Sequence, residues 1–345
     1  TSERRQTMNV AIAGATGLVG STMLRVLEEH QFPVSNLIPA ASERSAGKHV
    51  TFRGAQHVVR TMQETLDARP DVALFSAGGE VSREWAPKFA AAGITVIDNS
   101  SAFRMDPEIP LIVPEVNAHA LRPEHRIIAN PNCSTIQMVV VLQPLHAQFS
   151  LRRVVVSTYQ SVSGTGYKAL DQLEAETWNR LHPEAPREVR RVYPHPIDLN
   201  VLPHIDVFLE DGYTKEEQKM MQETRKIMGL PELAITATTV RIPVIGGHSE
   251  SVNAEFHHPL ALHAVREILQ AAPGVVLRDE PAQNCYPTPL DAQGKDEVFV
   301  GRLRLDASQS NALNLWIVAD NLRKGAATNA VQIATLLHQN GWIGS

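Results

Sequence analysis

The sequence of 345 residues predicts an α/β protein with an N-terminal doubly wound parallel sheet and a second α+β domain with a mixed sheet. From Met8 onward, short β-branched runs alternate with helical stretches, which is typical of a parallel sheet with crossover helices. A glycine-rich segment directly follows the first of these runs. Beyond Cys133 the strand candidates are longer and closer together, which favours a mixed or antiparallel sheet.

The N-terminal half carries the alternation from which the parallel sheet is inferred. Apolar β-branched runs predict its strands, and stretches with helical periodicity lie between them. We expect strands at residues 9–13, 36–41, 71–77, 94–98 and 126–129, with helices at 19–30 and 81–92.

The second half is expected to build the mixed sheet from strands at residues 153–159, 234–244, 251–257, 298–305 and 313–319. Helices at 167–180, 215–228 and 262–271 are expected to cover one face of this sheet and to leave the other for a partner subunit. The proline-rich stretch 181–203 predicts a long ordered loop. A last helix at 325–338 is expected to pack on the first domain, so the predicted domains are 8–132 with 323–345, and 133–322.

Composition excludes several classes of protein. A formal net charge of -5 and a pI near 6.3 leave no basic surplus for binding nucleic acid or an anionic membrane surface. The two cysteines lie far apart, so neither a disulfide framework nor a metal cluster is expected. The apolar runs are too short to span a bilayer. A cytoplasmic protein is therefore expected, with residues 1–7 as a short extension ahead of a start at Met8.

The glycine-rich segment predicts a Rossmann-like dinucleotide site. Gly14-Ala15-Thr16-Gly17-Leu18-Val19-Gly20 follows a strand and opens a helix, so its glycines permit a tight turn and its amides can bind a pyrophosphate. A plain strand-to-helix turn is the alternative. The candidate cofactor contacts in this segment are Gly14, Thr16, Gly17, Leu18 and Val19.

The end of the second strand indicates which dinucleotide is bound. An NAD enzyme usually presents a carboxylate here, whereas Ser42 and Arg44 could bind the 2′-phosphate of NADP. Glu43 between them keeps NAD, or a solvated charged loop, as alternatives. Ser76 and Gly78 end a later strand at the same edge of the sheet and are further candidates for contact with the cofactor, with a plain turn as the alternative.

Cys133 is a candidate nucleophile. It lies in Asn130-Pro131-Asn132-Cys133-Ser134-Thr135, between a strand and an apolar helical run. The unpaired amides at a helix start favour the thiolate over the thiol. A small buried apolar side chain is the alternative, because a cysteine is often only that.

His248 and Arg241 are candidates for proton transfer and for substrate binding. His248 lies in a glycine-rich bend after a strand, and an imidazole suits the loss of a proton from a thiohemiacetal hydroxyl. Arg241 stands among apolar residues on that strand, where a substrate carboxylate could pair with it. A surface or structural histidine and an internal salt bridge are the alternatives.

Further charged residues are candidates for binding substrate and phosphate. Glu216, Lys219 and Glu223 recur at helical spacing and share a face. A carboxylate beside an ammonium could hold an amino-acid head group and a phosphate, although a solvated charged face is also consistent with this pattern. Arg104 follows a strand end and is a candidate phosphate ligand.

Together these segments resemble aspartate-semialdehyde dehydrogenase. The resemblance extends from about Met8 to Gly341 and is most specific in the cysteine and histidine segments. It is carried by the segments 14–20, 42–47, 99–104, 130–135, 160–166 and 241–250.

The resemblance implies a role for individual residues. Cys133 would be the nucleophile, His248 the acid/base and Gln160 the group that orients a thioester. Arg241 would bind the substrate carboxylate and Glu216 would lie near its amino group. The resemblance further implies that inorganic phosphate is bound by Arg104, Asn132 and Lys219, and the cofactor by Ser163, Gly164 and, at the nicotinamide amide, Asn321.

The resemblance also implies the reaction. Members of the family reversibly reduce L-4-aspartyl phosphate with NADPH to L-aspartate 4-semialdehyde and phosphate, in lysine, methionine, threonine and diaminopimelate biosynthesis. A homodimer is implied, with a tetramer as the alternative, and the second domain serves catalysis and dimerisation. The rival readings are N-acetyl-γ-glutamyl-phosphate reductase, whose cysteine segment usually reads Asn-Pro-Gly-Cys-Tyr, a short-chain malonyl-thioester reductase, and a non-catalytic nucleotide-binding relative.

Overall fold

The computed structural model describes residues 8–344, and its chain divides into two compact units. The described residues of the first unit are 8–132 and 326–344, and those of the second are 133–325. The expected N-terminal extension, residues 1–7, lies outside the described residues. No helix within residues 8–344 is long and apolar enough to cross a membrane.

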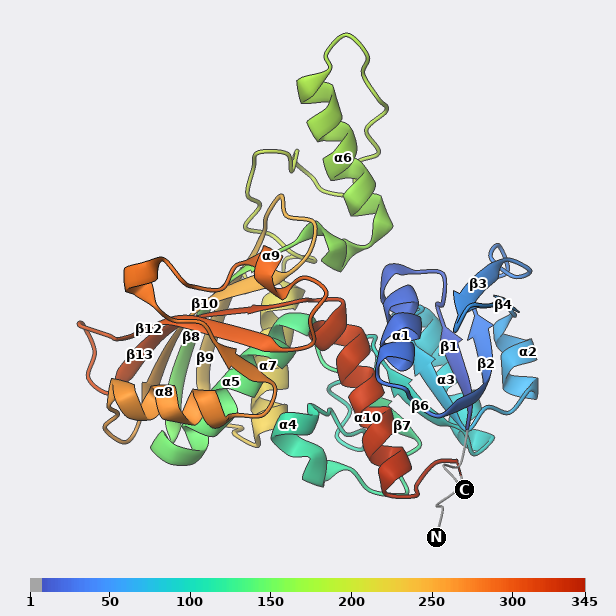
Figure 1. Cartoon of the computed structure of the whole chain (residues 1–345), viewed down its shortest axis with the longest axis horizontal. Coiled ribbons are helices and arrows are strands. Elements are labelled where there is room, and N and C mark those ends of the chain that lie inside the picture. Colours follow the sequence, from blue (N-terminus) through green and yellow to red (C-terminus); the bar gives the residue numbers. More distant parts are fainter. Residues whose placement is uncertain (1–7, 345) are drawn as a thin grey trace. The chain divides into compact units, whose positions relative to one another are not determined.

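The first unit is built on a five-stranded parallel sheet, as the alternation in the sequence predicts (Figure 1). The strand order is β2-β1-β5-β6-β7, so the chain places β2 on one side of β1 and then crosses to the other side. This reversal creates a switch point at the carboxyl ends of β1 and β5, where ligands bind in such sheets. The strands are β1 (Met8–Ala13), β2 (Val34–Ala40), β5 (Val72–Phe75), β6 (Thr95–Asp98) and β7 (Ile127–Ala129).

Helices cover both faces of this sheet because its strands are apolar on both sides. On β1, Val10 and Ile12 join one core cluster, whereas Ala11 and Ala13 join another. The first cluster includes α1 and α10, and the second includes α3. The helices of the unit are α1 (Leu18–Glu29), α2 (Met62–Asp67), α3 (Gly79–Ala91), α4 (Pro114–Asn117) and α10 (Thr328–Gln339). A small hairpin, β3 (His49–Phe52) with β4 (Ala55–Val58), was not expected from the sequence.

The second unit contains a six-stranded mixed sheet, which confirms the predicted fold class. The order is β11-β12-β13-β10-β8-β9, in which β8 pairs parallel with β9 and antiparallel with β10. The strands are β8 (Leu151–Gln160), β9 (Ala234–Arg241), β10 (His248–Phe256), β11 (Val275–Leu277), β12 (Val298–Leu305) and β13 (Ala312–Ala319). Helices α5 (Cys133–Phe149), α7 (Lys215–Met228) and α8 (Leu262–Ala271) pack on it.

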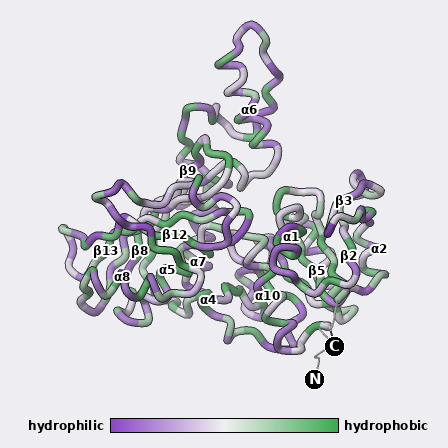
Figure 2. Tube along the Cα trace, in the orientation of Figure 1, coloured by the Kyte–Doolittle hydropathy of each residue, from purple (hydrophilic) through white to green (hydrophobic). Residues whose placement is uncertain are grey.

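One prediction about helix packing is wrong. The helix expected near 167–180, α6 (Tyr167–Leu181), does not cover the sheet but projects from it and packs on the short 3-10 helix Val162–Thr165 and the following loop (Figure 1). Helix α5 lies against the sheet, and hydrophobic segments run along it and the neighbouring strands (Figure 2). The long apolar run of α5 suits this buried position, whereas charged residues recur through α6.

Several expected element boundaries also differ from the structure, most notably around His248 and before the final helix. The strand expected at 234–244 ends at Arg241, because Pro243 cannot donate a ladder hydrogen bond. The next strand begins at His248 and not at 251, so His248 is the first residue of β10 and not part of a bend. The final helix is preceded by a turn of π-helix at Arg323–Ala327, a geometry that is frequent at functional sites.

Candidate active site

At one end of the sheet in the second unit, β8 and β9 end and β10 begins, and each strand places a polar residue on the same face of the sheet. Gln160 ends β8 and lies opposite Arg241 at the end of β9. The pairing of Tyr159 with Ser249 makes Gln160 the neighbour of His248 on β10. The side chains of Arg241, Gln160 and His248 are all buried, with relative exposures of 4%, 1% and 0%. Strand register alone therefore brings together three residues that are far apart in the sequence.

His248 is held through one ring nitrogen and presents the other. Its Nδ1 lies 3.1 Å from both the main-chain N and the Oγ of Ser161. Its Nε2 has no hydrogen-bond partner among residues 8–344 and faces the space beside Gly164, where an added Cβ would lie 3.3 Å away. Because an N–H can only donate, the Ser161 amide favours the neutral tautomer with its proton on Nε2.

The surroundings of His248 keep its ring neutral. Desolvation by burial holds its pKa well below the ordinary histidine value, and the positive charge of Arg241 adds to this effect. Ser161 Oγ can donate to Nδ1 of the neutral ring or accept from Nδ1–H of the charged one. It also lies 3.1 Å from Asn321 Oδ1, to which it donates in the second case. Protonation of Nδ1 therefore keeps the contact with Ser161 Oγ but loses the hydrogen bond from the Ser161 main-chain N–H.

Asn321 joins the loops around the imidazole. Its Oδ1 accepts from the Gly247 amide at 3.1 Å, and its Nδ2 donates to Ser163 Oγ at 3.0 Å. Gly164, which follows Ser163 in the chain, leaves space between the Arg241 guanidinium and the His248 ring. A Cβ added to Gly164 would lie 3.0 Å from Arg241 Nη1 and 3.3 Å from His248 Nε2. Ser163, Gly164 and Asn321 thus lie in the same cluster as His248.

Arg241 is a buried cation with unused hydrogen-bonding capacity. Its Nη1 donates to the main-chain oxygen of Ser161 at 2.6 Å, and its guanidinium lies 5.9 Å from the centre of the Tyr193 ring. Its Nε donates to no group among the described residues, and none of their carboxylates pairs with it. Since an uncompensated buried charge is costly, the site favours binding an anion.

A series of hydrogen bonds and ion pairs links Gln160 through α7 to the partly exposed side chain of Asp206. Gln160 Nε2 donates to Glu216 Oε1 at 3.4 Å, and Lys219 Nζ contacts Glu216 at 3.3 Å and Asp206 at 2.6 Å. Desolvation raises the pKa of Asp206, but its hydrogen bond and ion pair with Lys219 outweigh this, so that its pKa is lowered. A capping box of Thr214 with Glu217 fixes the start of α7 and hence the position of Glu216.

Cys133 is the first residue of α5, so its sulfur lies at the positive end of a helix dipole. One helical turn later, Gln137 donates through Nε2 to the main-chain oxygen of His248 at 3.3 Å. Residues four apart share a helix face, which places Cys133 on the face of α5 that meets β10. Gly325 is closely packed against this cysteine, because a Cβ there would lie only 2.7 Å from Cys133 Cβ.

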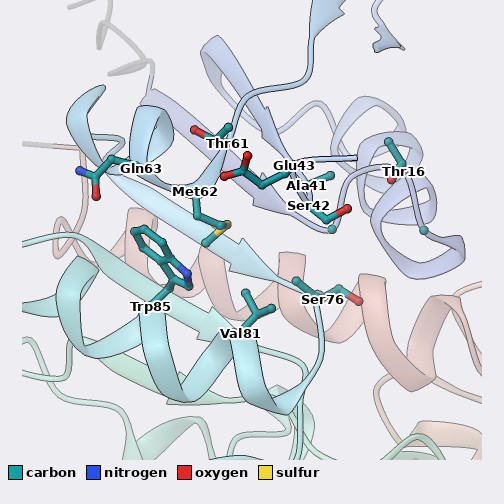
Figure 3. Close-up of a pocket in the computed structure, with 13 residues that line it drawn as sticks. Thr16, Ala41, Ser42, Glu43, Thr61, Met62, Gln63, Ser76, Val81 and Trp85 are labelled. Carbon is teal, nitrogen blue, oxygen red and sulfur yellow. The ribbon is translucent and has the colours of Figure 1, made fainter. Parts of the chain in front are cut away.

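The first unit has a cavity of about 490 Å³ at the glycine-rich turn (Figure 3). Gly14 has a φ of 85°, and a Cβ added to it would lie 2.2 Å from Ser76 O. Gly20 is equally restricted, since its Cβ would lie 2.1 Å from Gly14 O. Polar groups and an apolar wall line the cavity, which suits a ligand with phosphates and a flat ring; the lining includes Thr16, Gly17, Ser42, Met62, Ser76 and Trp85.

Not every predicted cofactor residue lines this cavity. Leu18 and Val19 form the first turn of α1. Gly78 is exposed and precedes α3 with a φ of 92°. Arg44 is exposed in the turn after Ser42, whereas Glu43 lines the cavity.

Arg104 and Asn132 belong to the first unit, whereas Lys219 belongs to the second. Arg104 donates through Nε to Asn130 O at 3.0 Å and through Nη2 to Asn99 O at 2.9 Å. Asn132 is buried and directly precedes Cys133. The described residues contain no group of His, Cys, Asp and Glu suited to a metal ion.

Comparison with known proteins identifies the family. Residues 9–123 match the semialdehyde dehydrogenase NAD binding domain, and residues 142–324 match the semialdehyde dehydrogenase dimerisation domain. The aspartate-semialdehyde dehydrogenase of Aquifex aeolicus is 55% identical over 97% of this chain and 99% of its own. The chain belongs to the aspartate-semialdehyde dehydrogenase family.

Two further relatives agree with this assignment. The Legionella pneumophila aspartate-semialdehyde dehydrogenase is 52% identical, over 96% of both chains. A crystal structure of aspartate semialdehyde dehydrogenase II from Vibrio cholerae, complexed with ASA, is 48% identical with a TM-score of 0.93, covering 97% of this chain and 99% of that one. The comparisons confirm the predicted family and favour it over N-acetyl-γ-glutamyl-phosphate reductase.

Within this family site, several contributing residues were not expected from the sequence. Ser161 holds the imidazole, Gln137 contacts the His248 main chain, Gly325 accommodates Cys133 and Asp206 pairs with Lys219. The sequence did contain one signal for Gln137, a lone amide in an apolar run four residues after the cysteine.

The contact between Gly325 and Cys133 predicts that Gly325→Ala impairs the thiol specifically. The added methyl group would displace Cys133, and we expect kcat to fall by roughly tenfold or more, because small misplacements of a reacting group are costly. Gly246→Ala is the matched control, since its Cβ would meet the flexible end of Gln293. Equal alkylation rates of Cys133 in both variants would contradict this account.

The buried imidazole predicts a pH-dependent contribution to stability. The pKa of His248 is lowered on folding, so its stabilising contribution is fully present above the unfolded-state pKa of about 6.5 and is lost as the pH falls below it. The unfolding temperature of wild type relative to His248→Gln should therefore decrease on acidification below that value. Exposed His263→Gln is the control, and a constant difference between wild type and His248→Gln would oppose the assignment.

Proposed function

We propose that this protein reversibly reduces L-4-aspartyl phosphate with NADPH to L-aspartate 4-semialdehyde and phosphate, through a thioester on Cys133. The observation that carries the proposal is the row of Arg241, Gln160 and His248, which adjoins the face of α5 that begins with Cys133. An anion-binding residue, an amide and a neutral imidazole beside a helix-start thiol suit acyl-phosphate chemistry.

The substrate groups are assigned by charge. The guanidinium of Arg241, which pairs with no carboxylate of the described residues, binds the substrate carboxylate, and the carboxylate of Glu216 attracts its ammonium. Gln160, which contacts Glu216, orients the acyl group. Arg104, Asn132 and Lys219 are assigned to inorganic phosphate, for which their cationic and amide donors are suited.

Cys133 and His248 carry the covalent and proton-transfer steps. The Cys133 thiolate attacks the acyl carbon, the bond to the phosphate oxygen breaks, and a thioester forms. When bound, the nicotinamide cofactor supplies hydride to the thioester carbon. In its protonated form, His248 then gives its Nε2 proton to the oxygen of the resulting thiohemiacetal, which leaves a neutral ring with a proton on Nδ1 beside Ser161 Oγ. In the oxidative direction Nε2 takes the proton back. The carbon–sulfur bond breaks as the aldehyde forms, which regenerates the thiolate.

The first unit supplies groups that fit a dinucleotide. The close approach of Gly14 to Ser76 and the side-chain-free N-cap Gly17 suit a pyrophosphate at the start of α1, with Thr16, Leu18 and Val19 contributing contacts. Ser76 and Gly78 are assigned to the same ligand. Ser42 and Arg44 favour NADP over NAD, because a serine hydroxyl and a guanidinium suit a phosphate better than a ribose hydroxyl.

The second unit supplies two further parts of the proposal. Ser163, Gly164 and Asn321 are assigned to the nicotinamide end, where the Asn321 amide can pair with the cofactor amide. The sheet face that carries Tyr159 and Trp316, whose ring centres are 5.4 Å apart, is proposed to form a homodimer interface. The match of this region to a dimerisation domain supports that assignment.

The proposed reaction predicts phosphate- and NADP-dependent oxidation of aspartate semialdehyde. Cys133→Ser should lower kcat by roughly three orders of magnitude or more, since it removes the nucleophile. Cys285→Ser, which changes the other thiol, should retain activity. NADPH formation, followed by absorbance, measures both variants, and NADPH consumption measures reduction of the acyl phosphates. Full turnover by Cys133→Ser, or equal use of N-acetyl-γ-glutamyl phosphate and L-4-aspartyl phosphate, would refute the proposal.

The proposed cofactor preference predicts a selective effect of the turn after β2. Replacing both Ser42 and Arg44 with alanine should raise KM for NADP by about tenfold or more and leave KM for NAD nearly unchanged, because only the 2′-phosphate contacts are lost. Lys48→Ala, an exposed cation of the same segment, is the control. A parallel rise for both cofactors would instead indicate damage to the turn.

A further inference from the structure

A buried carboxyl group lies further along β10 from the row of Arg241, Gln160 and His248, on the same face of the sheet. Glu250 is two residues after His248 on β10, so both side chains point to the same face of the sheet. It lies opposite Thr158 on β8 and Ile317 on β13 and has a relative exposure of 0%. No step of the proposed reaction uses it.

The surroundings of Glu250 do not suit an ionised group. Neither of its oxygens has a well-formed hydrogen bond among the described residues. Its neighbour Ile317 offers no polar group. Burial raises the pKa of the carboxyl well above its usual range, and the contact with Gln137, which lowers the pKa, only partly offsets this. A carboxyl group that is removed from water and receives no well-formed hydrogen bond favours its protonated form, which carries one O–H that can donate.

The amide of Gln137 is the complementary group. It reaches the Glu250 carboxyl from α5, and it is fully buried. Its Nε2 must face His248 O at 3.3 Å, because a main-chain oxygen only accepts. Its Oε1 is then left with no donor among residues 8–344. An O–H of Glu250 directed at Oε1 would satisfy both groups.

We propose that Glu250 is a positioning residue that acts as a buried neutral acid, donating to Gln137 and so fixing the first turn of α5 against His248. The inference rests on the proposed roles of Cys133 and His248. Gln137 is one helical turn from Cys133 and is bonded to the main chain of His248. Orienting this one amide therefore positions the thiol and the imidazole relative to each other.

The protonation state is tested without any activity measurement. The infrared difference spectrum of wild type minus Glu250→Gln at neutral pH should contain the C=O band of a protonated carboxyl group. Carboxylate bands in that spectrum would overturn the proposal. This result does not depend on which substrate the enzyme uses, so failure of the proposed function and failure of this inference are distinguishable.

The positioning role is tested by matched variants. Glu250→Gln keeps a neutral donor and should retain most of kcat, whereas Glu250→Ala and Gln137→Ala should each lower kcat by about tenfold with KM changed by less than about threefold. The double alanine variant should be no worse than either single one, because both remove the same contact. Alkylation of Cys133 by iodoacetamide should slow in parallel in the alanine variants.

Glu255→Gln is the control, because it also changes a buried glutamate on β10. Glu255 lies at the other end of the strand, where it forms an ion pair with Arg152 and accepts a hydrogen bond from Gln309. It should affect stability and leave kcat unaltered. Should Glu250→Ala fail to fold, Gln137→Ala tests the same contact from α5. A loss in Glu250→Gln as large as in Glu250→Ala, or full activity in Glu250→Ala, would refute the proposal.

Discussion

The pairing of β8 with both of its neighbours is the constraint on which the site depends. Gln160, Arg241 and His248 come from three strands, and only the register of β8 with β9 and β10 makes them adjacent. A slip of one residue would turn each side chain of the displaced strand to the other face of the sheet. The tight turn at Gly247, whose φ is 85° and whose Cβ would meet Pro289 at 3.0 Å, helps to fix where β10 begins.

Burial then determines the electrostatics of this row. Because Arg241 and His248 are both removed from water, the fixed charge of the guanidinium opposes protonation of the imidazole. A carboxylate bound to Arg241 would compensate that charge and make the imidazole easier to protonate. On the proposed roles of Arg241 and His248, substrate binding and proton transfer are thereby coupled through one pair of neighbouring side chains.

The sequence predicted the fold class and the chemical groups more completely than it predicted their arrangement. Alternating apolar runs indicate a parallel sheet because they reflect local periodicity, and the glycine-rich turn is likewise a local feature. The position of α6 and the contacts of Ser161, Gln137 and Asp206 arise from tertiary packing, which no short segment specifies. The strand pattern predicts the start of β10 three residues after its true start at His248, because polar residues at its beginning obscure the pattern.

In the proposed reaction, the acidic groups around Lys219 link binding of the substrate ammonium to binding of phosphate. Glu216, Asp206 and Lys219 together carry one net negative charge, which attracts an ammonium and repels a phosphate. When the substrate ammonium joins Glu216, the cluster becomes neutral and competition for Lys219 weakens. The cation can then turn toward an anion with little loss, because Asp206 and Lys219 are both partly exposed. On the proposed assignment of Glu216 to the ammonium and Lys219 to phosphate, amino-acid recognition and phosphate binding are electrostatically linked through one carboxylate.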